Sequence, residues 1–245
     1  MKILVIGEKC IDRFIYCETT KFCPEAPVPV LKPIEVVEND GMSGNVVKNI
    51  VAINSEALVT NWSQDEIIVK TRFVEKKSNH MFIRVDEGEY NVTPIELTND
   101  RLKEISEFDI VIISDYDKGF LSNEDLTIIG KNAKLSIIDS KRILSEEVIS
   151  NFSFVKLNEK ESIQNSNLLN HKNIIVTLGS RGTSYLGKIF PSPNPQETID
   201  VSGAGDTFTS AFIVKFKESN DIEESIIYAN NLSSIVVSKR GVAIP

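Results

Sequence analysis

Residues 199–212, I-D-V-S-G-A-G-D-T-F-T-S-A-F, combine a turn of small residues with one carboxylate. The turn at 202–205 runs directly into an apolar pattern of helical period, so its N–H groups stand at a helix N-terminus and favour an anion there. Asp206 follows in the first helical turn, where it can accept a proton from a nucleophile that attacks the anion. The alternative role is purely electrostatic, because a carboxylate at this position also complements the helix dipole by about 0.3–1 kcal/mol.

The rest of the chain alternates between short apolar runs of strand type and amphipathic stretches of helical type. The strand-type runs cover residues 2–6, 57–60, 110–113, 135–138, 154–157 and 174–178. The helical stretches cover 43–53, 122–132, 145–151, 203 to about 216, and about 221 to 237. This alternation predicts βαβ units, and therefore an α/β fold with a mostly parallel, Rossmann-like sheet and helices on both of its faces.

Two segments break this alternation. Residues 27–37 contain three prolines among alternating apolar positions, and residues 69–85 contain two extended runs joined by a polar turn at 76–79. Such patterns are typical of antiparallel strands with one wet face, and prolines are tolerated mainly at sheet edges. We expect both segments to form a small β-flap that projects from the α/β body.

The composition, 41% hydrophobic and 25% charged over 245 residues, is that of an ordinary globular protein. No apolar run approaches the ~18 residues of a membrane span, and the first twelve residues are typical of a strand rather than a signal peptide. The net charge of −8, without a basic block, argues against nucleic acid as a partner. The three cysteines and two histidines lack disulfide-framework or zinc spacing. We expect a single cytoplasmic domain spanning residues 1–245.

The turn and its carboxylate resemble the D-T-x-G-A-G-D signature of the ribokinase-like (PfkB) carbohydrate kinases, with Ser202 in place of the usual threonine. Within that family, five further segments are most similar to the heptose-phosphate kinases, which form one half of the bifunctional heptose synthases of lipopolysaccharide precursor synthesis. These segments are V-I-G-E-K-C-I-D-R-F (5–14), C-P-E-A-P-V-P-V (23–30), G-M-S-G-N-V-V-K-N-I (41–50), S-D-Y-D-K-G (114–119) and I-V-V-S-K-R-G (235–241). The sequence has no P-loop and no protein-kinase signature.

This resemblance implies a ribokinase-like domain with lid segments at about 14–38 and 68–92, and ATP-dependent phosphorylation of a sugar hydroxyl. It implies that Asp206 accepts the hydroxyl proton. The N–H groups of Gly203, Ala204 and Gly205 would stabilise the charge that develops on the phosphoryl group. ATP and Mg²⁺ are the implied cofactors, with a monovalent cation, K⁺, as a further candidate.

Three residues near the N-terminus match positions that contact the sugar in the family. Asp12 would accept hydrogen bonds from sugar hydroxyls, and its alternative is a strand-end or turn aspartate. Gly44 and Asn45 match the glycine and asparagine of the same site. Their alternative is a helix N-terminus, which Ser43 or Asn45 would cap.

Three more residues are candidates for the substrate side. Asp115 and Lys118 follow a strand at the edge where open α/β sheets bind ligands. Lys118 would pair with a phosphate already on the substrate, or it is a solvated loop lysine. Arg72 and Arg84 lie in the flap strands, where an outward-facing charge is the default expectation, but Arg72 remains a candidate for the substrate phosphate.

The resemblance also implies a nucleotide site. Asn158 and Glu161 match the N-x-x-E motif and would hold Mg²⁺, largely through water. Their alternative is a helix-capping pair, since Asn at N-cap and Glu at N3 is a variant of the capping box. Thr177, Gly179 and Gly182 resemble the T-x-G-x-x-G nucleotide loop, and Asn230 falls where the family places a helix residue near adenine.

The implied substrate is a heptose 7-phosphate, phosphorylated at O1, or a related precursor of cell-surface polysaccharide. Relatives carry an additional turn, helix and strand where this chain has only N-W-S-Q-D-E at 61–66, and we expect no nucleotidyltransferase half. The shortening leaves open another phosphorylated sugar as substrate, or an idle family member that binds a sugar phosphate or a partner protein. A homodimer through the β-flap is also expected, because an exposed strand edge favours such pairing.

Overall fold

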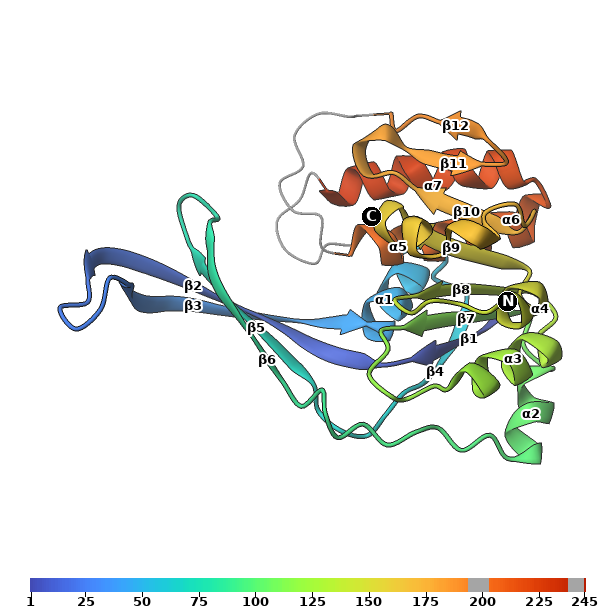
Figure 1. The fold of residues 1–245 in the computed structure, drawn as a ribbon, viewed down its shortest axis with the longest axis horizontal. Helices are drawn as coiled ribbons and strands as arrows, with labels where there is room; N and C mark the ends of the chain where they lie inside the picture. The colour runs from blue at the N-terminus through green and yellow to red at the C-terminus, as the bar shows by residue number, and fades with distance from the viewer. Residues whose placement is uncertain (194–202, 238–244) are drawn as a thin grey trace.

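The computed structural model describes residues 1–193, 203–237 and 245. Its body is a sheet of eight strands in the order β12-β11-β10-β9-β8-β7-β1-β4 (Figure 1). Its strands β10, β9, β8, β7, β1 and β4 run parallel to one another, and β11 and β12 add an antiparallel edge. Their bounds are β1 Lys2–Gly7, β4 Leu58–Trp62, β7 Ile110–Asp115, β8 Ser136–Ser140, β9 Phe154–Asn158, β10 Ile174–Thr177, β11 Thr183–Tyr185 and β12 Lys188–Phe190.

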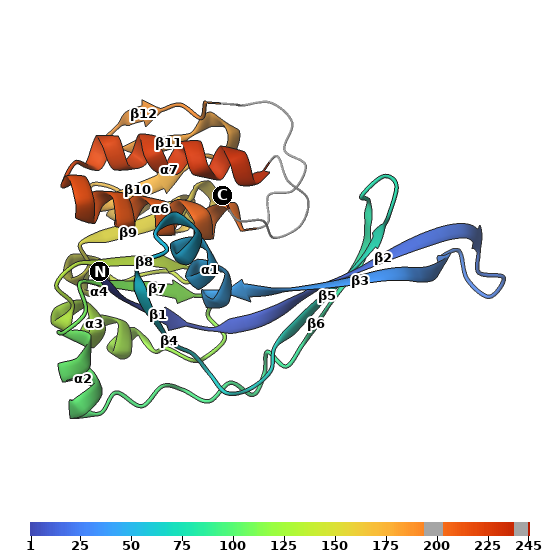
Figure 2. The ribbon, with the colours of Figure 1, turned by 180° about the vertical axis from the view of Figure 1, so that it is seen from behind.

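Helices cover both faces of this sheet, as the alternation predicts. One face carries α1 (Ser43–Ile53), α6 (Ala204–Ser219) and α7 (Ile222–Val237), and the other carries α2 (Asn99–Ile105), α3 (Asn123–Asn132) and α4 (Glu146–Asn151) (Figure 2). The short helix α5 (Glu159–Gln164) follows β9, and two 3₁₀ turns lie at Ser166–Leu168 and Gly179–Arg181. Strand side chains alternate between the two layers, with Ile3 and Val5 packing against α1 and α6 while Leu4 and Ile6 face the opposite layer.

A second sheet of four strands, in the order β3-β2-β5-β6, forms a long arm that projects from the body (Figures 1 and 2). It consists of β2 (Lys9–Phe22), β3 (Pro29–Met42), β5 (Val69–Glu75) and β6 (Met81–Glu87). The arm is larger than the small flap expected, because β2 and β3 are each 14 residues long and pair along their length from Lys9 and Met42, at the body, to Phe22 and Pro29. Its central pair, β2 and β5, is parallel rather than antiparallel. The proline-bearing β3 is an edge strand, as predicted.

Several elements differ from the sequence expectations. The helix α2 and the strands β11 and β12 have no counterpart among the predicted elements, because each is too short for its periodicity to stand out. Residues 199–202, which include Ser202, and residues 238–241 of the I-V-V-S-K-R-G segment lie outside the described residues. Within the described part of the chain, every helix is too short or too polar to cross a bilayer.

Candidate active site

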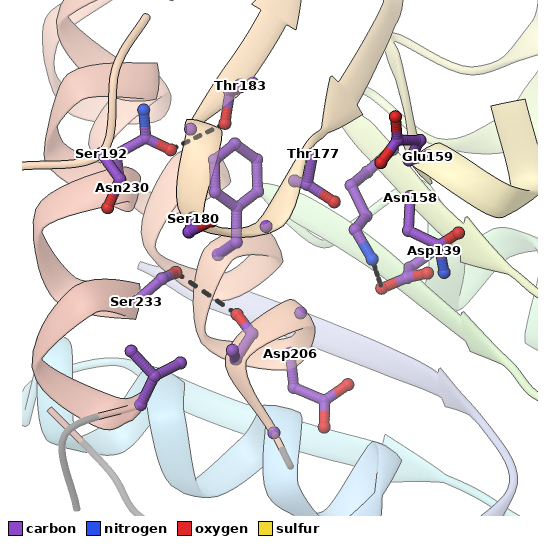
Figure 3. Close-up of a pocket in the computed structure, with 18 of the residues that line it drawn as sticks. Asp139, Asn158, Glu159, Thr177, Ser180, Thr183, Ser192, Asp206, Asn230 and Ser233 are labelled. Carbon is purple, nitrogen blue, oxygen red and sulfur yellow. Dashed lines mark hydrogen bonds and ion pairs between the residues drawn. The ribbon is translucent and has the colours of Figure 1, made fainter. Parts of the chain in front are cut away.

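A cavity of about 790 Å³ lies at the carboxyl ends of β8, β9 and β10, against the N-terminus of α6 (Figure 3). Parallel strands present their carboxyl ends at one edge of a sheet, which is where α/β proteins bind ligands. Nine of the residues singled out in the sequence line this cavity: Asn158, Thr177, Gly179, Gly182, Gly203, Ala204, Gly205, Asp206 and Asn230. In Figure 3, Asn230 and Thr183 lie together at the top of the view and Asp206 lies at the bottom.

The N-terminus of α6 forms one wall of the cavity. Gly203 is the N-cap residue, with a positive φ of 83° and no side-chain cap, and its carbonyl accepts the first helical hydrogen bond from Thr207. The N–H groups of the residues between them therefore have no acceptor within the helix. A Cβ on Gly205 would lie 3.1 Å from Lys156 Nζ, so glycine keeps the approach to these N–H groups open.

Asp206 is buried beside this turn and accepts two hydrogen bonds. Asn45 Nδ2 donates to its Oδ2 at 2.7 Å, and the Tyr116 hydroxyl donates to its Oδ1 at 3.3 Å. Burial raises the pKa of Asp206 from its ordinary 3.8 to about 6, against the lowering effect of the Asn45 hydrogen bond. A carboxyl with this pKa is ionised at neutral pH and is still basic enough to accept a proton.

Asn45 contacts Asp206 from α1, 161 positions away in the chain. It does not cap α1, whose N-cap residue Met42 makes no side-chain cap hydrogen bond. Its neighbour Gly44 faces elsewhere, into a second cavity of about 410 Å³ lined also by Lys9, Val47 and Asn61. The structure therefore brings Asn45, but not Gly44, next to the carboxylate of α6.

Five charged residues that line the cavity are absent from the sequence-based set, and three of them, Asp139, Lys141 and Lys156, form one ion-pair cluster. Lys156, in the middle of the apolar strand β9, is almost completely buried and donates to Asp139 Oδ2 at 2.7 Å. Lys141 lies 3.6 Å from Asp139 Oδ1. Despite its burial, the pKa of Asp139 is lowered by these two lysines. The sequence signal that could have identified this ion pair is the lysine within an apolar strand, because a buried ammonium requires an acidic partner.

Asn158 and Glu161 form the capping box that was their alternative interpretation. Asn158 Oδ1 accepts from the Glu161 N–H at 2.9 Å, and Glu161 Oε2 accepts from the Asn158 N–H at 2.7 Å. Glu161 Oε1 also accepts from Lys141 Nζ at 2.7 Å. Across the described residues, no group of three or more His, Cys, Asp or Glu side chains could hold a metal by itself.

This donor set nevertheless fits a hydrated Mg²⁺ held mainly by phosphate oxygens, which needs only one or two carboxylates. Asp139 Oδ1 is buried and accepts no hydrogen bond, so it can accept one from a water of such an ion. Glu161 already accepts three hydrogen bonds from Asn158 and Lys141, two at Oε1 and one at Oε2, so its Oε2 can still accept one from a water of the ion.

The loop after β10 carries the two glycines of T-L-G-S-R-G at positive φ, 60° at Gly179 and 93° at Gly182. A Cβ on Gly182 would collide with the Phe190 carbonyl, so only glycine fits there. Asn230 reaches the same wall from α7. Its Oδ1 accepts from the Thr183 hydroxyl at 2.7 Å and its Nδ2 donates to the Phe190 carbonyl at 3.0 Å, which ties α7 to β11 and β12.

On the other side of Asp206, the arm contributes a pair of nearly buried charges. Arg72 on β5 donates to Asp12 on β2 and stacks over the Phe14 ring at 5.1 Å. The expectation that Arg72 points outward is therefore wrong: its side chain is only 14% exposed. Arg84 does face solvent, where it pairs with Asp86.

Lys118 is neither solvated nor free. Its Nζ donates to Glu89 Oε2 at 2.6 Å, and Lys70 Nζ lies 3.2 Å from Glu89 Oε1. Lys70 also lies over the Tyr116 ring, 5.7 Å from its centroid. Two lysines therefore share one carboxylate near Asp206, on the side of the arm.

Asp115, expected on the substrate side, is instead a structural residue. It is fully buried, and Arg142 holds both of its oxygens at 2.6 and 2.9 Å while the Ser140 hydroxyl donates to it at 2.5 Å. These donors leave it no access to the cavity, so we withdraw it as a substrate contact. Strand-end position alone did not distinguish Asp115 from its neighbour Tyr116, which does reach Asp206.

The loop that carries Tyr116 and Lys118 is held by Glu8, which sequence reasoning did not single out. Glu8 is completely buried after β1 and accepts the N–H groups of Tyr116, Lys118 and Phe120 at 2.8, 3.0 and 3.3 Å. A carboxylate with three backbone donors acts as a rigid anchor. Its signal in the sequence was a glutamate directly after the apolar run K-I-L-V-I-G.

Residues 60–245 match the pfkB family of carbohydrate kinases. The bifunctional protein HldE of Helicobacter pylori is 28% identical over 297 aligned positions, which include 99% of this chain and 64% of that protein. HldE of Nitratiruptor is also 28% identical, with 62% of its length covered. The chain thus spans less than two thirds of the length of these curated relatives, and the alignments are longer than the chain itself.

Solved structures of similar shape bear out the ribokinase-like fold. Ribokinase from Thermotoga maritima superposes with a TM-score of 0.74 at 19% identity, covering 98% of this chain and 94% of that one. Ribokinase from Arabidopsis thaliana, solved with ribose and ATP, gives 0.73 at 16% identity, covering 98% and 93%. The expected ribokinase-like fold is therefore confirmed, and the family match supports the expected class of enzyme, a phosphotransferase with an alcohol group as acceptor. The chain belongs to the pfkB family of carbohydrate kinases.

Proposed function

We propose that this protein transfers the γ-phosphoryl group of ATP to a hydroxyl of a phosphorylated sugar, with a heptose 7-phosphate, phosphorylated at O1, as the first candidate. The observation that carries the proposal is Asp206, a buried carboxyl with a pKa of about 6 at the N-terminus of α6. A base at that position lies between the sheet-edge cavity on one side and the charged side chains of the arm on the other.

The residues divide into a nucleotide side and a sugar side. Gly179, Gly182 and Asn230 line the cavity where ATP would lie, and the N-terminus of α6 would meet its terminal phosphate. The sugar would lie between Asp206 and the arm, near Asn45 and Asp12. Lys70, Arg72 and Lys118 bring three cations to that side, which supports a substrate that already carries a phosphate.

In the proposed reaction, the sugar O–H bond breaks as its oxygen forms a bond to the γ-phosphorus. The proton passes to Asp206, and the bond to the bridging oxygen of ATP breaks to release ADP. The free N–H groups at Gly203, Ala204 and Gly205 stabilise the charge on the transferred group. Bound Mg²⁺, held through water by Glu161 and Asn158, would neutralise phosphate charge. The arm would cover the sugar and exclude water.

The test is ATP consumption by the purified chain with a panel of sugar phosphates, heptose 7-phosphate first, compared with the Asp206→Asn variant. We expect turnover that rises with pH through about 6, where Asp206 ionises. We expect a loss of about 10²–10⁴-fold in kcat for the variant, with little change in KM. An Asp206→Asn protein that keeps most of its turnover would refute the assignment.

The competing function is binding of a sugar phosphate without turnover, as expected of an idle family member. It is favoured by the internal pairing of the sugar-side charges, Asp12 with Arg72 and Glu89 with Lys70 and Lys118. If this function is correct, a sugar phosphate of the panel should raise the melting temperature of the protein, and no member of the panel should cause ATP consumption.

We also propose a homodimer through the arm. Its edge strands, β3 and β6, expose Ile34, Val36, Met81 and Ile83, and exposed apolar edge strands favour pairing with another chain. Light scattering should give twice the chain mass at micromolar concentration. A monomer mass across the whole concentration range would contradict the dimer.

A further inference from the structure

The interface between α1 and α6 contains a set of buried polar side chains within an otherwise apolar contact. Asn45 and Asn49 lie one turn apart on α1, and Thr207 directly follows Asp206 on α6. All three are at most 1% exposed, and Val46, Ile50 and Phe208 surround them. Asn49 and Thr207 do not line the cavity, so contact with a ligand does not explain their burial.

Hydrogen bonds join these side chains into a chain that ends at Asp206. The Thr207 hydroxyl donates to Asn49 Oδ1 at 2.7 Å. Asn49 Nδ2 donates to the Asn45 backbone carbonyl at 2.8 Å and to Asn45 Oδ1 at 3.2 Å. Asn45 Nδ2 then donates to Asp206 Oδ2 at 2.7 Å. Each amide therefore presents its oxygen to one neighbour and its nitrogen to the next.

The direction of this chain is set by a group that cannot reverse. The Asn45 backbone carbonyl is only an acceptor, so Asn49 must turn its Nδ2 toward Asn45 and its Oδ1 toward Thr207. With Asn49 Nδ2 fixed in this way, Asn45 must present Oδ1 to Asn49 and Nδ2 to Asp206. A flip of either amide would bring two acceptors together in a buried site, which is unfavourable.

The two oxygens of Asp206 are thus unequal. Oδ2 faces the fixed amide donor of Asn45, whereas Oδ1 faces the Tyr116 hydroxyl, whose proton can rotate so that the hydroxyl accepts instead. A carboxyl can take a proton more easily on the oxygen whose neighbour can become an acceptor. We propose that Asn49, supported by Thr207, is a positioning residue that holds the Asn45 amide as a permanent donor to Asp206 and thereby directs the transferred proton to Oδ1.

This inference rests on the proposed role of Asp206 as the base. The effect of Asn49 on the ionisation of Asp206 does not depend on that role. A fixed donor stabilises the ionised carboxylate. When Asn49 is replaced, the Asn45 amide can flip. A protonated Asp206 can then donate to Asn45 Oδ1, which stabilises the neutral form of Asp206. The ionisable groups that also act on Asp206 come from other elements: Cys10 on β2, Tyr116 after β7, Asp139 on β8, Lys141 directly after β8, and Lys156 on β9. Substitutions of Asn49 leave all of these in place.

The experiment measures the ionisation of Asp206 by ¹³C NMR of labelled aspartate carboxyls, assigned against Asp206→Asn, together with the pH profile of kcat. Asn49→Leu should raise the Asp206 pKa by about one unit, equivalent to about a tenfold loss of turnover on the acid side of the profile, with little loss at pH 9. Thr207→Val removes the support of Asn49 together with the hydrogen bond from the Thr207 hydroxyl to the Gly203 carbonyl, and it should shift the acid limb by about threefold. Thr207→Ser should restore the wild-type profile.

Ser210→Ala is the matched control, because Ser210 is a buried hydroxyl of the same interface that donates to the Val46 carbonyl at 3.3 Å and does not contact Asn45 or Asn49. It should leave the Asp206 pKa unchanged. An unchanged pKa in both Asn49→Leu and Thr207→Val, or an equal shift in Ser210→Ala, would overturn the proposal. If neither the wild type nor any variant consumes ATP but the NMR shift occurs, the proposed function fails, while the inference that Asn49 holds the Asn45 amide as a donor to Asp206 stands.

Discussion

Replacing Asp206 with asparagine should make the protein more stable above pH 7, although it removes the proposed base. Asp206 is buried, and burial raises its pKa from its ordinary 3.8 to about 6 because the ionised form is poorly solvated there. Asparagine keeps the same shape. Its oxygen can accept from Asn45 Nδ2 as Oδ2 does now, and its nitrogen can donate to the Tyr116 hydroxyl. The substitution therefore removes the cost of the buried charge without leaving either neighbour unpaired.

The size and the sign of the effect follow from the shift in pKa. Well below pH 4, at about pH 2–3, Asp206 is mostly protonated in both the folded and the unfolded chain and contributes little difference. As pH rises from about 4 to 6, the unfolded chain releases this proton while the folded chain retains it, so the free energy of unfolding of the wild type decreases. Above about pH 7 the loss is complete, and a shift of about two units corresponds to about 3 kcal/mol. Asp206→Asn lacks this loss.

Urea denaturation of both proteins between pH 4.5 and 8 tests this reasoning. The gain in the free energy of unfolding of Asp206→Asn that comes from this ionisation should be about 1 kcal/mol at pH 4.5 and about 3 kcal/mol at pH 8. Asp109 offers a control of opposite sign, because the Lys2 N–H holds its pKa below the ordinary value, so Asp109→Asn should not stabilise the protein at pH 8. A variant at Asp206 that is no more stable than the wild type at pH 8, or equally more stable at both pH values, would refute the argument.

Three further substitutions address the supports of the site. Gly205→Ala places a Cβ 3.1 Å from Lys156 Nζ and should lower kcat at least about tenfold. It should not lower the melting temperature, since alanine favours a helix over glycine by up to about 1 kcal/mol. Unchanged steady-state kinetics would contradict this expectation. Lys156→Met leaves Asp139 buried without its closest cation and should cost about 3–5 kcal/mol in urea denaturation, most of which the double variant with Asp139→Leu regains. Glu8→Gln turns one acceptor of the 116–120 loop into a donor. It should cost about 1–3 kcal/mol and speed hydrogen exchange at these amides; protection equal to wild type would argue against the anchor.

The elements that position the site were largely predictable because their signals are local. Helix α1 has the bounds that its apolar period predicts, Ser43–Ile53, and the six parallel strands lie where the apolar runs do. The turn at 203–205 and Asp206 were likewise readable, because small residues before an amphipathic helix describe one continuous piece of backbone. The strand-helix alternation also predicted the sheet edge at which the cavity lies.

Tertiary structure alone decided which side chains meet at that edge. Asn45 reaches Asp206 across 161 residues, and Lys156 pairs with Asp139 on the neighbouring strand. Asp115 occupies an equally plausible strand end, yet Arg142 captures it and excludes it from the cavity. The physical reason is that burial leaves a charged group no alternative to a partner within about 3 Å. Which partner lies within that distance depends on strand order and helix packing, and no local pattern of residues encodes those.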